Sequence, residues 1–326
     1  MKVVITGGGG FLGQRLARTL VDRGRLTGPD GHEAEIDDLL LFDAVAPPPI
    51  GAAGPVRSEQ GDIGDRATVD RLIDRDDIAV FHLASMVSGE GEQDFDRALR
   101  VNLMGGLHLF EALRARASCP RVVFASSIAV FGGPAMPPRV GDMTRPVPQT
   151  TYGMTKAAGE LLVNDYTRKG FLDGRSARLP TIVIRPGKPN AAASSFASAV
   201  FREPLAGIDY VLPVAPGTAM PVLGYRAVVD CLVRLHELPG AELGADRAVG
   251  LPSLNVTVQD MIDALHRTAG DRRLGRVTIE PDPFIQGICD SWPRETAYDR
   301  TDELGMPRES TLDEIVAYYI ADYVDG

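Results

Sequence analysis

The stretch KVVITGGGGFLGQRLARTLVDRG, residues 2–24, decides the fold predicted for this chain. Its first five residues are typical of a short buried β-strand, four glycines follow, and the remainder has the spacing of an amphipathic helix. Glycines in such a turn permit positive φ and let the backbone approach a pyrophosphate, which the free N–H groups of the helix can bind. The order of strand, glycines and helix therefore indicates nucleotide binding rather than an ordinary tight turn.

The glycines of this turn have the spacing of a dinucleotide site. Three of them recur at three-residue intervals, and the overlapping set that starts at Gly8 satisfies G-x-G-x-x-G. The cofactor-binding residues predicted in this turn are Gly7, Gly10, Phe11, Leu12 and Gly13.

An acidic residue, Asp43, closes the next apolar strand, LLLF. A carboxylate there can accept both hydroxyls of an adenosine ribose and would repel a 2′-phosphate, and the following residues, AVAPPP, contain no Arg or Lys. This pattern favours NAD over NADP, with a solvent-exposed strand-end acid as the alternative. A loop at 25–38 explains why Asp43 lies about ten residues later than usual. Asp62 and Ile63 are expected to frame the adenine.

Strands and helices alternate through the first half of the chain. Apolar strands are predicted at 2–6, 39–42, 78–84, 121–127 and 181–187, and they lack the alternation of half-exposed strands. Such strands are covered by helices on both faces. The predicted fold class is therefore α/β, a doubly wound parallel (Rossmann) sheet with a smaller C-terminal α/β substrate domain.

Two domains are predicted from this pattern. Residues 1–187 form the NAD-binding Rossmann domain, and residues 188–326 form mainly a substrate-binding domain, with the return of parts of 220–250 to the Rossmann sheet left open. The second domain has two clear helices. One lies in VTVQDMIDALHRTAG with Thr257 as its N-cap, and the other in TLDEIVAYYIADY, introduced by Ser310 or Thr311.

Composition limits the classes of partner. The chain has 326 residues, of which 44% are hydrophobic and 24% charged, values typical of a soluble globular protein. A net charge of -10 argues against nucleic-acid or anionic membrane surfaces, and no apolar run approaches the roughly 18 residues of a membrane span. Three scattered cysteines, the lack of metal-ligand spacing and the lack of a signal-peptide apolar region predict a cytoplasmic protein without a metal site.

The stretch TYGMTKAAGE places Tyr152 and Lys156 four residues apart on a predicted helix, so both side chains share one face. Ser127 ends an apolar strand 25 positions before the tyrosine. A free tyrosine has a pKa of roughly 10, and a neighbouring ammonium would lower it by favouring the phenolate. This set predicts oxidation of a hydroxyl group, with Tyr152 as the base and Ser127 holding the reacting oxygen. The alternatives are an accidental surface pair and a strand-end capping serine.

Five segments, TGGGGFLG, HLAS, VNLMGG, FASSIAVFGG and YGMTK, are similar in order and spacing to the extended short-chain dehydrogenase/reductase family. The resemblance implies that Ser127, Tyr152 and Lys156 are catalytic and that Lys156 also holds the nicotinamide ribose. It implies a homodimer in which helices at 96–117 and 152–169 form the contact. It also implies a structural role for Asn102, with an ordinary helix asparagine as the alternative. Further cofactor contacts are expected at Leu83, Ala84, Ser85, Asn102, Tyr152, Lys156 and Pro186.

A finer resemblance covers nearly the whole chain. DYTRKGFLDG, RLPTIVIRPGKPN, AASSF, REPLAG, GLPSLNVTV and SWP are similar to the D-erythronate dehydrogenase subfamily. The resemblance implies NAD-dependent oxidation of a four-carbon sugar acid at C2, which gives 2-dehydro-D-erythronate. The segment MPVLGY departs from the aromatic- and His-containing run, followed by Ser-Pro, that is usual in this subfamily. A related aldonate or another hydroxy acid therefore stays open as the substrate.

A sugar acid needs a partner for its carboxylate, and the planar fork of arginine can bind both oxygens. Arg226 in VLGYRAVVD is the candidate, with an ordinary surface arginine as the alternative. Arg185 and Lys188 are assigned instead to the turn beside the nicotinamide. The substrate residues predicted are Ser85, Ser127, Ser194 and Arg226.

Two other functions fit part of this pattern. A nucleotide-sugar epimerase of the same extended family would use the same serine, tyrosine and lysine, but it keeps its cofactor and returns the hydride to the other face. The RPGKPN and AASSF segments favour the dehydrogenase. A non-catalytic dinucleotide sensor is the third reading, and it would have no need of an intact Ser–Tyr–Lys set.

Overall fold

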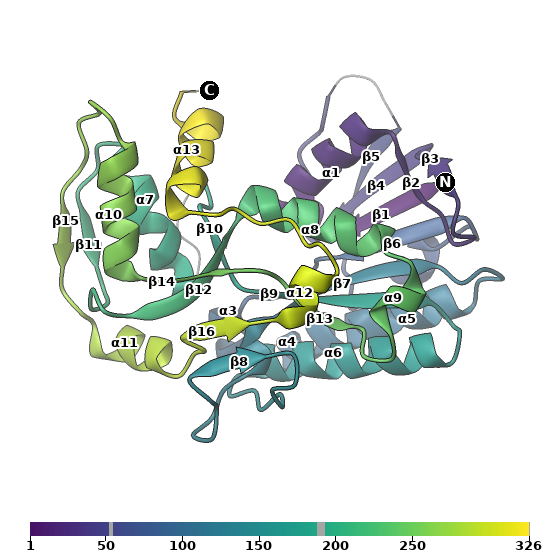
Figure 1. Cartoon of the computed structure of the whole chain (residues 1–326). Coiled ribbons are helices and arrows are strands. Elements are labelled where there is room, and N and C mark those ends of the chain that lie inside the picture. Colours follow the sequence, from purple (N-terminus) through teal and green to yellow (C-terminus); the bar gives the residue numbers. More distant parts are fainter. Residues whose placement is uncertain (52–54, 188–192, 326) are drawn as a thin grey trace. The chain divides into compact units, whose positions relative to one another are not determined.

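The computed structural model describes residues 1–51, 55–187 and 193–325 (Figure 1). The chain forms two compact units. Unit 1 comprises Met1–Val130, Thr150–Arg178 and Val229–Val249, and unit 2 comprises Phe131–Gln149, Leu179–Val228 and Gly250–Gly326. The units interleave along the chain. Val229–Val249, within the range 220–250 whose return to the first domain the sequence leaves open, belongs to unit 1, whereas Phe131–Gln149, expected in the NAD-binding domain, belongs to unit 2.

Unit 1 is built on a seven-stranded sheet with the order β13-β9-β7-β6-β1-β4-β5. β1 pairs in parallel with β4 and β6, β4 pairs in parallel with β5, and β6 with β7. The strand order reverses at β1, so the carboxyl ends of β1 and β6 flank the point where open α/β sheets bind ligands. The strands are β1 (Lys2–Thr6), β4 (Asp38–Asp43), β5 (Val56–Gln60), β6 (Ile78–His82), β7 (Arg121–Ser127), β9 (Asp173–Leu179) and β13 (Ala248–Gly250).

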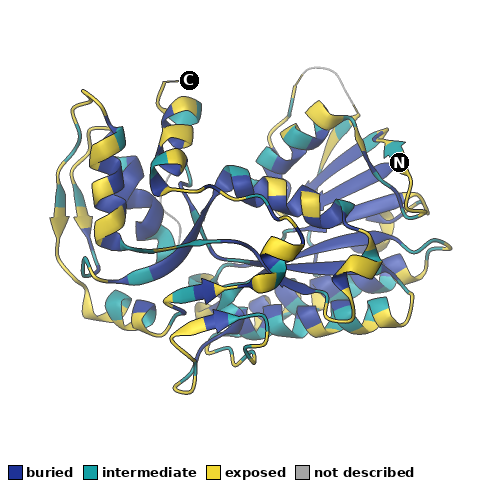
Figure 2. Ribbon diagram, viewed as in Figure 1, coloured by how far each residue is buried: buried dark blue, intermediate teal, exposed yellow. Residues whose placement is uncertain are grey.

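Helices cover both faces of this sheet, and its central strands, such as β1 and β6, are buried (Figure 2). Val80 of β6 packs in a buried cluster with Leu109 and Val163 from two of the helices. The next residue, Phe81, points to the opposite face, where its ring centre lies 5.3 Å from that of His236. The helices are α1 (Phe11–Arg23), α2 (Arg66–Leu72), α3 (Ser88–Gln93), α4 (Phe95–Ala98), α5 (Gly105–Arg114), α6 (Thr151–Arg168), α8 (Tyr225–Glu237, which continues from unit 2) and α9 (Gly240–Leu243).

Three segments differ from the sequence-based expectation. The strand expected at 181–187 is shorter, β10 (Thr181–Val183), and belongs to a sheet of unit 2, while β9 joins the large sheet instead. The loop expected at 25–38 contains an antiparallel pair, β2 (Arg25–Thr27) and β3 (Glu33–Glu35). The long helix expected at 96–117 is divided into α4, a π-helical turn η1 (Leu99–Met104) and α5.

Unit 2 contains smaller sheets and its own helices. Thr257 caps α10 in a capping box with Asp260, and Thr311 caps α13, which confirms both predicted helix starts. The strands are β10, β12 (Ala219–Gly224) and β14 (Leu254–Thr257) in one sheet, β11 (Tyr210–Leu212) with β15 (Val277–Ile279), and β8 (Arg139–Gly141) with β16 (Glu295–Ala297). The helices are α7 (Phe196–Leu205), α10 (Val258–Thr268), α11 (Pro283–Asp290), α12 (Asp299–Glu303) and α13 (Leu312–Tyr323).

Candidate active site

The glycine turn between β1 and α1 has no room for a side chain at two positions. A Cβ on Gly13 would lie 2.3 Å from the carbonyl oxygen of Gly7. A Cβ on Gly7, whose φ is +75°, would lie 2.8 Å from the Ala84 nitrogen. Gly10 is the N-cap of α1 and offers no side chain to its first turn, which Phe11 and Leu12 begin. This close backbone packing at a helix N-terminus fits the pyrophosphate of a dinucleotide.

Asp43 ends β4 beside this turn. Its Oδ2 accepts the N–H of Gly9 at 2.9 Å, and its Oδ1 accepts the N–H of Ala44 at 2.7 Å. Two backbone donors therefore hold the half-buried carboxylate against the glycine turn. That is the position from which an acid can reach the adenosine ribose of a bound dinucleotide.

Asp62 and Ile63 lie in the turn after β5. Asp62 accepts the N–H of Gly64 at 2.8 Å and forms an ion pair with Arg100. Ile63 is buried, and a Cβ on Gly105 would lie 3.0 Å from its side chain. The structure thus ties this turn to the η1–α5 segment, and the expected adenine contact stays a prediction.

The segment Leu83–Ser85 follows β6 at the same edge of the sheet. Thr6 Oγ1 accepts the N–H of Ala84 at 3.3 Å and shares a 2.7 Å hydrogen bond with Nδ1 of His82. Burial, and then the charge of Lys156, lower the pKa of His82 to about 3, so the imidazole is neutral. Thr6 is not among the predicted site residues. The register of the two strands could have identified it, because Thr6 and His82 end the neighbouring strands β1 and β6 opposite one another.

Asn102 holds the continuation of this segment from η1. Its Oδ1 accepts the N–H of Met86 at 2.7 Å, and its Nδ2 donates to the carbonyl of Met86 at 3.2 Å. Its Nδ2 also lies 3.5 Å from Thr155 Oγ1, whose hydroxyl donates to the carbonyl of Tyr152 at 2.8 Å. The asparagine thus links the chain after β6 to the first turn of α6, which agrees with the structural role expected from the family resemblance.

Ser127, Tyr152 and Lys156 lie together where β7 ends and α6 begins. Thr150 caps α6 by accepting the N–H of Gly153 at 3.0 Å, so the helix begins one residue before Tyr152. Ser127 Oγ accepts the N–H of Ala129 at 3.1 Å, and the serine side chain acts to lower the pKa of the Tyr152 phenol. Nζ of Lys156 lies 5.4 Å from the centre of the Tyr152 ring. The structure therefore brings the three residues expected to be catalytic into one cluster.

The electrostatics of this cluster differ from the expectation for the phenol. Burial raises the pKa of Tyr152, and the hydrogen bond with Ser127 only partly opposes that shift. Burial also lowers the pKa of Lys156 to about 7, so near neutrality this amine is charged only part of the time. In this structure burial sets the direction of the phenol's pKa shift, because both groups lose hydration at the same place, and the lowering of this pKa by Lys156 together with the positive nicotinamide ring stays a prediction.

The substrate residues expected in the second half of the chain lie in unit 2. Arg226 donates from Nε to Asp322 at 3.1 Å, and its guanidinium lies 4.3 Å from the centre of the Tyr318 ring. A second hydrogen bond from Arg226 to Asp322 completes a bidentate pair. The guanidinium is thus already bound to a carboxylate of its own chain, whereas the sequence-based expectation is that it binds the carboxylate of the substrate.

Other expected contacts near the nicotinamide are less informative. Ser194 lies in the short 3₁₀ turn Ala193–Ser195 before α7, and Pro186 follows β10. The N–H of Arg185 donates to Ser198 Oγ at 3.0 Å. Lys188 lies outside the described residues. The roles of these residues stay predictions.

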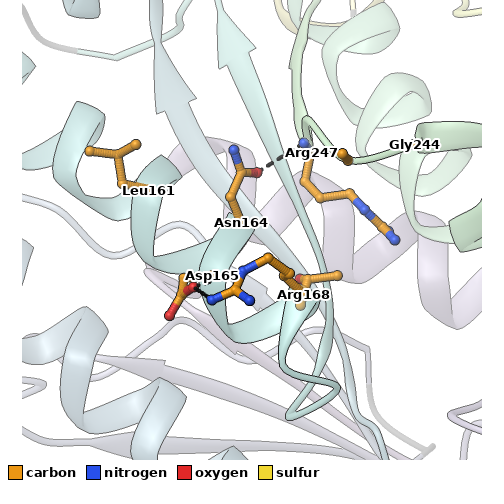
Figure 3. Close-up of a pocket in the computed structure, with 8 residues that line it drawn as sticks. Leu161, Asn164, Asp165, Arg168, Gly244 and Arg247 are labelled. Atoms are coloured by element: carbon orange, nitrogen blue, oxygen red, sulfur yellow. Dashed lines mark hydrogen bonds and ion pairs between the residues drawn. The ribbon is translucent and has the colours of Figure 1, made fainter.

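A pocket of about 450 Å³ in unit 1 lies away from the cluster (Figure 3). Its polar groups bond to one another: Asn164 accepts the N–H of Arg247 at 2.9 Å, and Arg168 pairs with Asp165. It is lined by the C-terminal half of α6 and the loop before β13, none of which is among the predicted site residues. This pocket is therefore not assigned a role in substrate or cofactor binding.

The fold and the cluster define a class of protein. A glycine turn at the reversal point of a parallel sheet, an acid at the end of the adjacent strand and a Ser–Tyr–Lys set are the parts of a dinucleotide-dependent oxidoreductase. Over the residues that the structure describes, no three His, Cys, Asp or Glu side chains gather as metal ligands. No described helix has the length and apolar character needed to span a bilayer.

The chain belongs to the NAD-dependent epimerase/dehydratase family, whose model matches residues 3–238. Over 99% of its length it is 49% identical to D-erythronate dehydrogenase of Cupriavidus necator, covering 98% of that protein. Over 98% of its length it is 40% identical to D-erythronate dehydrogenase of Haemophilus influenzae, covering 99% of that protein. The solved nucleoside-diphosphate-sugar epimerase of Agrobacterium tumefaciens matches with a TM-score of 0.93 and 39% identity, over 100% of this chain and 95% of that one.

These matches confirm three predictions. The fold is the doubly wound α/β (Rossmann) class, the chain is an extended short-chain dehydrogenase/reductase acting on CH–OH groups, and NAD is its cofactor. The finer resemblance to D-erythronate dehydrogenases is also confirmed as a similarity over the whole chain.

Proposed function

We propose that this enzyme oxidises the C2 hydroxyl of D-erythronate, giving 2-dehydro-D-erythronate. The observation that carries the proposal is the clustering of Ser127, Tyr152 and Lys156 where β7 ends and α6 begins, with Nζ of Lys156 5.4 Å from the centre of the Tyr152 ring. The D-erythronate dehydrogenase relatives, which match over the whole chain, name the substrate. A related four- to six-carbon aldonate is the nearest variation of this proposal.

Each group of the cluster has a defined task in this reaction. NAD, when bound, would supply the acceptor for the hydride that leaves the substrate carbon. Ser127 donates a hydrogen bond to the reacting oxygen and fixes its position, and Tyr152 takes the hydroxyl proton as general base. Lys156 lies close enough to stabilise the phenolate as it forms and to hold the nicotinamide ribose. Asp43 favours NAD because its carboxylate would repel a 2′-phosphate.

The second candidate is a nucleotide-sugar epimerase, favoured by the name of the solved Agrobacterium tumefaciens relative. It would use the same three residues, so their geometry does not separate the two. Release of the reduced cofactor separates the two functions, because a dehydrogenase accumulates NADH whereas an epimerase regenerates NAD within each turnover.

We further propose a cytoplasmic homodimer that uses η1, α5 and α6. Exposed apolar side chains on these elements support it, since Leu161 of α6 is 70% exposed and Met104 of η1 is 41% exposed. Leu161→Glu is expected to give a monomer in light scattering. A dimer that persists in this variant would place the contact elsewhere.

The test of function is a screen for NADH absorbance with D-erythronate and other C4–C6 sugar acids, and with UDP-sugars in parallel. We expect steady NADH formation with D-erythronate or a close aldonate and none with UDP-sugars. Interconversion of UDP-sugars without net NADH would instead assign the epimerase activity.

A further inference from the structure

Two consecutive residues near the end of β7 are bonded to α6. Nζ of Lys156 donates to the carbonyl of Ala125 at 2.7 Å. The Ser126 hydroxyl donates to Oε1 of Glu160 at 2.6 Å. The next residue, Ser127, ends the strand. Tyr152, Lys156 and Glu160 are spaced by four residues, so they form one stripe along the helix.

Glu160 is a buried charge in this stripe. It is 4% exposed, and its partner Arg178 of β9 is 5% exposed. Arg178 donates to both carboxylate oxygens at 2.8 Å, from Nε and from a terminal nitrogen. With the bond from Ser126, the carboxylate accepts three hydrogen bonds from the two neighbouring strands β7 and β9.

Such a buried ion pair is weak evidence of a contribution to stability. The cost of removing both charges from water offsets most of their attraction, and an apolar pair of similar volume is often as stable. What the pair supplies is geometry, because a bidentate arginine fixes the direction and distance of its carboxylate. Here the fixed carboxylate of Glu160 accepts the hydrogen bond of Ser126, which immediately precedes Ser127 in β7.

We propose that Glu160 is a positioning residue that sets the register between Ser127 and Tyr152. Arg178 orients its carboxylate, and the carboxylate holds Ser126, so α6 cannot slide or rotate against the end of β7. The inference rests on the proposed roles of Ser127 and Tyr152 in hydroxyl oxidation. It goes beyond them because Glu160 touches neither substrate nor cofactor and acts through its neighbour.

The test compares variants that keep different parts of this link. Ser126→Ala removes the hydroxyl alone. Glu160→Asp keeps the charge but shortens its reach. Glu160→Gln combined with Arg178→Met removes both charges, so that neither is left buried and unpaired. The matched control is Asn164→Ala on the same helix. It removes the hydrogen bonds that Asn164 forms with Asp246 and Arg247, away from the cluster.

We expect kcat to fall by about tenfold to a hundredfold in Ser126→Ala and Glu160→Asp, since misplacement by about 1 Å can cost this much. The KM for NAD should change by less than about threefold, and the pH profile of kcat should shift, because Ser127 is displaced relative to the phenol. Asn164→Ala should lower only the melting temperature. If all three Glu160 and Ser126 variants keep wild-type kcat and pH profile per folded molecule, the positioning role is overturned.

A second measurement is independent of the substrate. Crystal structures of Ser126→Ala and Glu160→Asp should show a longer distance between the Ser127 and Tyr152 oxygens than in the wild type, whereas Asn164→Ala should leave that distance unchanged. An unchanged distance in both site variants overturns the inference even if the enzyme is active. Conversely, if the wild-type enzyme forms no NADH with any acid, the proposed function fails, and the crystal structures alone decide the role of Glu160.

Discussion

The amine of Lys156 and the carbonyl oxygen of Ala125 are 2.7 Å apart, which ties the middle of α6 to the end of β7. The same amine lies 5.4 Å from the Tyr152 ring centre and 5.0 Å from that of Phe124. A buried amine held by a carbonyl and two aromatic rings can still carry a proton, since both kinds of neighbour favour the cation. The Lys156 amine is thus held in a fixed position beside the Tyr152 ring.

Tyr152→Phe tests the general base. We expect kcat to fall by about 10²- to 10⁴-fold, the usual contribution of a positioned base, while NADH affinity measured by fluorescence stays close to wild type. Because burial raises the pKa of Tyr152, kcat/KM of the wild-type enzyme should rise with pH above neutrality. The control is Tyr166→Phe on the same helix, whose hydroxyl bonds to Glu111 outside the cluster. Equal losses in both variants would contradict the assignment.

Lys156→Met tests the buried amine through stability. Burial lowers the pKa of Lys156 from its ordinary value of 10.5 to about 7 in the folded chain, so between these two pH values the unfolded chain binds more protons than the folded one. The free energy of unfolding of the wild type relative to the variant should therefore rise with pH across this window, by at most about 1.4 kcal/mol per pH unit. Urea unfolding at several pH values measures this difference.

The exposed Lys169 at the end of α6 provides the control for that experiment. Lys169→Met should differ from wild type by an amount that does not change with pH. A flat difference for Lys156→Met as well would mean that the amine is not desolvated in the folded protein.

Asp43→Asn tests cofactor choice. The carboxylate is expected to accept hydrogen bonds from the ribose, and a bond to a charged group contributes about 1.5–3 kcal/mol. We therefore expect the KM for NAD to rise by about tenfold to a hundredfold. The preference for NAD over NADP should become smaller. Asp38→Asn, at the other end of β4 and paired with Arg57, should leave both constants unchanged. An unchanged KM in Asp43→Asn would limit this residue to holding Gly9.

The site was predictable where its residues follow one another in local motifs. The glycine turn, the acid closing β4 and the tyrosine–lysine pair each occupy a fixed place relative to a strand or helix, so their spacing carries the information. Strand β9 was missed because its sequence, DGRSARL, contains two arginines that propensity places at the surface. They are buried because Arg175 bonds to Asp173 and Arg178 bonds to Glu160, contacts that no local pattern reveals.

Arg226→Met separates the expected substrate role from the observed structural one. In the structure this side chain pairs with Asp322 and lies over Tyr318, interactions that together contribute on the order of 1 kcal/mol at a partly exposed site. We expect the melting temperature to fall by about 2–4 °C while the KM for the sugar acid changes by less than about twofold. Asp322→Asn should reproduce the loss of stability, because it breaks the same pair from the other side. A KM raised tenfold or more in Arg226→Met, at an unchanged melting temperature, would instead show that the guanidinium leaves Asp322 to bind the substrate carboxylate.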